Sequence, residues 1–190
     1  MPNWKLINDC VQELIEVFPR LDSGLNLVQR CVEDEFEVDC PDLIPAMRAS
    51  YQEFGIWLAD VFQEEPLPAG IVALNLGLFE NSGGIQLYVS GAQTWEPDDP
   101  EWAHDMIYWP ENRHAPSGLL GRIFDEAELD EDACLYLGLA AVIVFTLELA
   151  REKPDLFDAD TLFVCTGYDD GELYSFGRIN PTGIEPLIED

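Results

Sequence analysis

Residues 133–147 read ACLYLGLAAVIVFTL, the longest uncharged apolar stretch of the chain. A helix that is apolar all round is buried, either in a protein core or in a membrane. The stretch has 15 residues, fewer than the roughly 20 that span a bilayer, and three acidic residues precede it without a basic anchor. We therefore expect a buried central helix, with Asp130 or Asp132 as its N-cap and Pro154 closing it.

Apolar residues recur at helical spacing in further segments on both sides of this stretch. In the first of them Trp4, Ile7 and Val11 share one face, and Pro19 ends the helix because proline cannot continue the backbone ladder. The predicted helices cover residues 4–18, 21–32, 42–63 and 117–126, the second as a short helix or turn.

Two other regions carry the pattern of β-hairpins. Residues 71–79 and 85–90 are apolar, branched runs separated by a Gly-rich turn. Residues 161–166 and 172–179 flank a turn that contains Asp170-Gly171, a strong hairpin signal. With a final short strand at 184–188, the sequence predicts one α+β domain over residues 1–190. Its antiparallel sheet of four to five strands, built from two hairpins, is expected to pack against about five helices.

The charge of the chain is strongly negative. It has 38 acidic and 9 basic side chains, a formal net charge of −29, yet 47% of its residues are apolar and 11% aromatic. That apolar content excludes a disordered acidic tail. The charge disfavours direct binding of nucleic acid and of anionic membranes, and it favours a basic protein as partner. Plain solubility is the alternative explanation, and the oligomeric state stays open.

Five cysteines are scattered without CxxC spacing, and residues 1–20 contain acids where a secretory segment would be continuously apolar. We therefore expect reduced thiols and a cytoplasmic protein. His104 and His114 are the only histidines and neither flanks a cysteine, which disfavours a zinc site. Asp98-Asp99 or Asp130-Glu131-Asp132 could bind calcium weakly, but neither matches a calcium-binding loop, so we expect no metal site and no cofactor.

Motifs of catalysis are missing from the sequence. It has no GxSxG, and its glycine pairs lack the lysine of a phosphate-binding loop. Among 38 acids, no spacing singles out a catalytic pair. The sequence therefore predicts a protein that is not an enzyme, although a carboxylate-dependent hydrolase remains an alternative.

The long connection at residues 91–116 holds three of the five tryptophans, interleaved with acids. Long loops in compact domains are functional or disordered, and interfaces favour tryptophan. We predict that this loop binds the partner through its carboxylates and aromatic rings; the alternative is that its tryptophans anchor the loop to the core. Acidic clusters at 33–42, 96–105 and 125–132 could extend this surface if they converge. The predicted contact residues are Trp95, Asp98, Asp99, Glu101, Trp102 and Asp105.

Two stretches carry a family resemblance. FVCTGYDDGELYSFGRINPTGI at residues 163–184 and LYVSGAQTWEPDDPEWA at residues 87–103 resemble segments of the immunity proteins of bacterial polymorphic-toxin and type VI secretion systems. The resemblance covers about a quarter of the chain and departs from the SUKH-type pattern. It implies a non-enzymatic inhibitor that binds a cognate toxin domain in the cytosol.

The charge, the loop and the resemblance lead to one functional hypothesis. We expect an immunity protein that neutralises a basic toxin domain through an acidic, Trp-rich surface. A DNA mimic that displaces DNA from a DNA-binding protein is the other binding hypothesis, and it would compete with duplex DNA for many basic partners.

Overall fold

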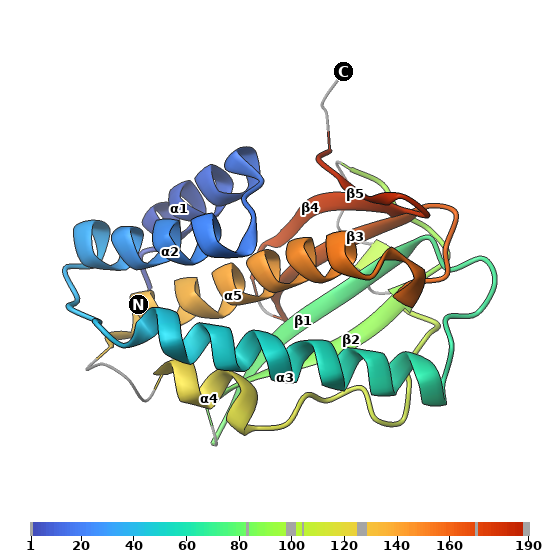
Figure 1. Ribbon diagram of the computed structural model, residues 1–190, viewed down its shortest axis with the longest axis horizontal. Coiled ribbons are helices and arrows are strands. Elements are labelled where there is room, and N and C mark those ends of the chain that lie inside the picture. Colours follow the sequence, from blue (N-terminus) through green and yellow to red (C-terminus); the bar gives the residue numbers. More distant parts are fainter. Residues whose placement is uncertain are drawn as a thin grey trace.

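The computed structural model describes residues 2–82, 84–97, 102–103, 105–124, 129–169 and 171–187. Within these residues the chain forms an α+β fold: five α-helices and a five-stranded sheet with the strand order β2-β1-β3-β4-β5. The helices gather on one face of the sheet, and α5 lies between the sheet and the outer helices (Figure 1).

The helices follow the periodicity and the proline positions of the sequence. Asn3 caps the first helix by accepting a hydrogen bond from the Leu6 backbone N–H (3.4 Å), and its C-cap Phe18 has a left-handed backbone conformation directly before Pro19. Asp130 caps the central helix by accepting from the Ala133 N–H (2.8 Å). The helices are α1 (Trp4–Val17), α2 (Leu21–Glu35), α3 (Leu43–Glu64), α4 (Gly118–Phe124) and α5 (Glu131–Glu152), and a 3₁₀ turn covers Pro154–Leu156.

Both predicted hairpins are present, and a short final strand follows them. The strands are β1 (Ala73–Asn81), β2 (Gly84–Ala92), β3 (Leu162–Tyr168), β4 (Leu173–Asn180) and β5 (Gly183–Glu185). The expectation of a fully antiparallel sheet is wrong, because β1 and β3 pair in parallel. The two hairpins meet through their first strands, and a parallel pair needs a long crossover connection. Here α4 and α5 supply it, so no local turn signal announces the pairing.

The central helix α5 is buried as expected. Every residue from Leu135 to Leu147 is buried, and Phe145 packs against the rings of Tyr51 and Phe54. Its length and composition would also fit a membrane span, but 89% of its most apolar window is buried inside the fold. The helix therefore forms the centre of the main core, which α1, α2 and α3 complete.

The sheet has two unlike faces. On the helix-covered face, Leu74, Leu76 and Leu78 of β1 belong to the main core. The opposite, loop-covered face carries the alternate residues of the same strands. There Ala73 and Cys165 join Trp102 and Met106 of the long connection in a second, smaller cluster. The connection predicted as the binding loop therefore contributes to the cover of this second face of the sheet.

Candidate functional site

Trp95 and Trp102 both contribute to the cover of the loop-covered face. The indole of Trp95 is half-buried and stacks on Phe163 with 3.7 Å between ring centroids and 3° between planes. Its Nε1 donates a hydrogen bond to Ser175 Oγ (3.4 Å). Trp102 is 5% exposed within the smaller cluster. Both side chains therefore fit the anchoring alternative, since the atoms that hold the loop are not free for a partner.

The predicted carboxylates of this loop are only partly placed. Asp105 is exposed, and its backbone N–H donates to the Trp102 carbonyl (3.1 Å). Asp98, Asp99 and Glu101 lie outside the described residues. The structure thus brings Trp95 and Trp102 together and leaves Asp105 at the surface, while the contact set as a whole stays a prediction.

Beneath the loop, polar side chains run in a row across four strands. Asn75 is paired in register with Ser90 on one side and Cys165 on the other, and Cys165 is paired with Ser175. The Cys165 sulfur lies 3.2 Å from Ser175 Oγ. Burial raises the pKa of this thiol to about 12, so it stays protonated and unreactive near neutral pH.

The end of the long connection runs along the edge strand β2. Gly91 N–H donates to the Tyr108 carbonyl (3.0 Å), and Ala115 N–H donates to the Leu87 carbonyl (2.9 Å). These bonds occupy an edge that would otherwise offer unpaired backbone groups. Tyr108, an aromatic residue of this connection, is buried and donates from its hydroxyl to the Glu65 carbonyl (2.6 Å).

Trp109 is the tryptophan of this connection with the most accessible ring. It is 50% exposed, stacks on Tyr88 with 6.2 Å between centroids and carries the Arg113 guanidinium 5.7 Å from its ring centroid. Tyr88 in turn donates to Asp169 Oδ1 (2.7 Å). Ile107 beside it is also exposed, so the β2 edge presents an aromatic and apolar surface.

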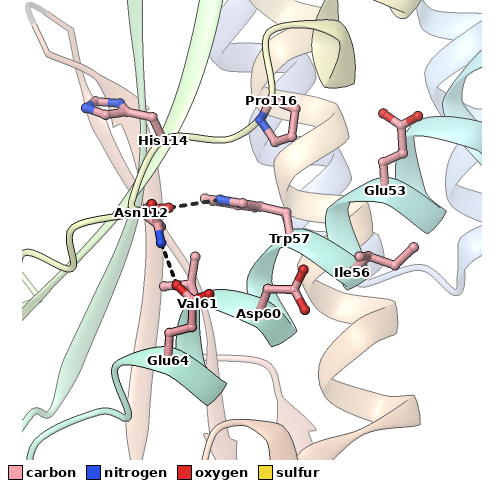
Figure 2. Close-up of a pocket in the computed structure, with 9 residues that line it drawn as sticks. All are labelled: Glu53, Ile56, Trp57, Asp60, Val61, Glu64, Asn112, His114 and Pro116. Atoms are coloured by element: carbon pink, nitrogen blue, oxygen red, sulfur yellow. Dashed lines mark hydrogen bonds between the residues drawn. The ribbon is translucent and has the colours of Figure 1, made fainter.

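The same connection forms a groove with helix α3. Residues 112–116 make one wall and the outward side of α3 makes the other, and they enclose about 590 Å³ (Figure 2). Trp57 Nε1 donates to the Asn112 carbonyl (3.4 Å), and Asn112 Nδ2 donates to Glu64 Oε2 (2.5 Å). These bonds fix the distance between the walls. The lining residues are Glu53, Ile56, Trp57, Asp60, Val61, Glu64, Asn112, His114 and Pro116.

Carboxylates and one exposed isoleucine dominate this groove. Glu53 forms an ion pair with Arg122 (2.6 Å), whereas Asp60 is exposed and has no hydrogen-bond or ion-pair partner among the described residues. Ile56 is 63% exposed between them. Burial and the neighbouring Arg113 lower the pKa of His114, so its imidazole adds no positive charge at neutral pH. The groove is therefore negative with an apolar centre.

Sequence reasoning missed this groove. The signal available was the exposed side of the helix predicted at residues 42–63. Glu53 and Asp60 recur there at a spacing that places them on one side, with Ile56 between them, and Glu64 follows one residue beyond the predicted end. The opposite wall could not be found, because its contacts join positions far apart in the sequence.

The three acidic clusters are only partly placed, because residues 98–101 and 125–128 lie outside the described residues. Phe36 stacks on Tyr136 (5.3 Å between centroids), and Asp132 accepts from the Asn3 backbone N–H (2.9 Å). The cluster at 33–42 therefore lies near the acidic start of α5, at the end of the sheet that holds the β1–β2 turn (Figure 1). The cluster at 96–105 follows Ala92, which is at the opposite end of that hairpin.

Within the described residues, no three His, Cys, Asp or Glu side chains are grouped so that they could hold a metal ion. Comparison with known proteins found no relative: no protein-family model, no curated protein and no solved structure matches this chain. The functional argument therefore rests on the charges and surfaces of the molecule itself.

Proposed function

We propose that this protein is a non-catalytic binding protein of the cytoplasm that neutralises a basic protein, in the manner of an immunity protein that blocks a toxin domain. The observation that carries the proposal is uncompensated negative charge. Even if each of the 9 basic side chains neutralised one carboxylate, 29 carboxylates would remain. Such an excess destabilises the fold through self-repulsion, and a basic partner would relieve it.

The positions of the basic side chains support this proposal. Among the described residues, five of them form ion pairs with acids of the same chain. A sixth, Arg113, lies over the Trp109 ring. Six of the nine bases are thus engaged by groups of the chain itself. The paired residues are Lys5, Arg48, Arg122, Arg151 and Arg178.

Exposed apolar side chains beside the acids add to the support. Ile56 is 63% exposed and Trp109 is 50% exposed. Acidic residues lie around Ile56 in the groove. Interfaces gain affinity from buried aromatic and apolar anchors and gain rate and selectivity from charge. A surface that offers both is better suited to a defined protein partner than to loosely held cations.

The proposal is tested by affinity capture followed by an inhibition assay. The protein, immobilised, is exposed to lysate of its source organism at low and at high salt, and retained proteins are identified by mass spectrometry. We expect one dominant basic protein that stays bound to the immobilised protein at high salt. A stoichiometric amount of the immunity-like protein should abolish the activity of that captured protein. Many basic proteins that are all lost together at high salt would contradict the proposal. Competition of duplex DNA for them would favour a DNA mimic.

A further inference from the structure

We propose that the groove between α3 and residues 112–116 receives a segment of the basic partner that is rich in arginine and lysine and presents an apolar side chain to Ile56. This inference rests on the proposed function. It assigns the contact site to α3 and to the end of the long connection, and none of the six predicted contact residues lines it. Charge complementarity selects the occupant, because the groove combines carboxylates with an exposed apolar centre.

The three carboxylates of the groove have different tasks. Glu64 accepts from Asn112 and thereby holds the loop wall in place, and Glu53 is shared with Arg122. Asp60 has no such task within the described part of the chain, and Figure 2 shows its side chain beside Ile56 on the open side of α3. Asp60 is therefore the carboxylate best placed to bind an arginine or lysine of the partner.

Ile56 gives the groove its preference for a segment that is both basic and apolar. The Ile56 side chain is 63% exposed among acids. Covering it removes apolar surface from water, which is favourable. A small cation would satisfy Asp60 but leave Ile56 exposed. Burying both at once requires a ligand with cationic and apolar groups side by side.

The dimensions of the groove favour a peptide segment over an isolated side chain. From Glu53 to Glu64 the helix rises about 16 Å at roughly 1.5 Å per residue, which is enough for several residues of a partner. Both walls are fixed before binding, by the Trp57–Asn112 and Asn112–Glu64 hydrogen bonds. A preformed groove costs little ordering when it binds.

Two matched pairs of variants test the groove. Ile56→Lys and Val17→Lys each add one positive charge at an exposed apolar residue, but Val17 lies on α1, away from the groove. Asp60→Asn and Glu16→Gln each remove one negative charge at an exposed acid. Within each pair the net charge is equal, so long-range attraction is equal as well. Thermal unfolding followed by circular dichroism checks that all four variants fold.

The first probe is a fluorescein-labelled peptide of arginine and lysine with a leucine at every fourth position, measured by fluorescence anisotropy at physiological salt. We expect Ile56→Lys to weaken its binding about tenfold and Asp60→Asn about fivefold, with changes below about twofold in the two α1 variants. An oligolysine of the same length and charge should bind the parent protein more weakly and should lose less on Ile56→Lys. If the parent does not bind the peptide, or if both variants of each pair lose the same affinity, the groove is not the binding site.

The second probe is the basic protein that stays bound to the parent chain at high salt in the affinity capture. We expect Ile56→Lys to lose it and Val17→Lys to retain it. Equal retention by both would overturn the groove while the proposed function stands. If the parent captures no salt-resistant basic protein, the proposed function itself fails, and the inference built on it fails too.

Discussion

The helix-covered and loop-covered faces of the sheet are built in different ways from the same strands. The first packs leucines of β1 against α5, in which every residue from Leu135 to Leu147 is buried and only Thr146 among them is polar. The second carries Asn75, Ser90 and Cys165 under residues of the long connection, among them Trp102 and Met106. The free energy of folding therefore comes mainly from the helix-covered face, because apolar burial there is larger and continuous.

The largest test of this difference is Phe145→Ala in the middle of α5. Phe145 is fully buried, with its ring 5.7 Å from the ring of Tyr51 and 5.8 Å from that of Phe54, measured between centroids. We expect a loss of about 3–5 kcal/mol in the free energy of unfolding, since the variant loses apolar burial and leaves a cavity. Urea unfolding measures it, with exposed Val17→Ala as the control that should change little. A loss below about 1 kcal/mol would contradict the central role of α5.

Trp95→Ala is the matching change on the loop-covered face. The ring of Trp95 is half-buried on Phe163, so we expect a smaller loss, about 2 kcal/mol. The effect should also be local: hydrogen exchange should speed up in residues 105–109 and stay unchanged in α5. A loss as large as that of Phe145→Ala, with faster exchange in both places, would mean that the two faces unfold as a single unit.

The same contrast explains what the sequence could predict. The helices and both hairpins follow from local signals such as Pro19, Asp130 and the Asp170-Gly171 turn. The parallel pairing of β1 with β3 does not, because it joins segments separated by the whole crossover.

The candidate site likewise has one part that the sequence could predict and one part that it could not. Acids and exposed apolar residues of α3 are visible as a helix face in the sequence. The groove exists only because Asn112 reaches both Trp57 and Glu64 across a long separation. The tryptophans of the long connection could be recognised as important, but burial decides between anchoring and binding, and local sequence carries no measure of burial.

A third prediction uses pH to probe the loop-covered face. Burial raises the pKa of Cys165 from its ordinary value of 9.0 to about 12. The unfolded chain thus loses this proton first, and the stability linked to the protonated thiol is full below pH 9 and is lost as pH rises toward 12. At pH 10 we expect the parent to have lost about 1 kcal/mol through this group, and Cys165→Ala to lack that decline.

The measurement is the free energy of unfolding from urea titrations at several pH values between neutral and alkaline. Other groups whose pKa is raised by burial, such as Tyr108 at about 12, contribute equally to both proteins and cancel in the comparison. Parallel pH profiles for the parent and Cys165→Ala would show that this thiol is solvated in the folded protein, and that the loop is a loose cover.

The sharpest comparison of the two faces concerns one hydroxyl on each. Thr166, on the helix-covered face, donates from Oγ1 to the Leu76 carbonyl (2.8 Å). Ser90, on the loop-covered face, is fully buried and its Oγ has no hydrogen-bond partner among the described residues. Thr166→Val should cost about 1–2 kcal/mol, and Ser90→Ala should be neutral or stabilising by up to about 1 kcal/mol. Equal costs, measured by urea unfolding, would mean that the Ser90 hydroxyl is hydrogen-bonded in the folded protein.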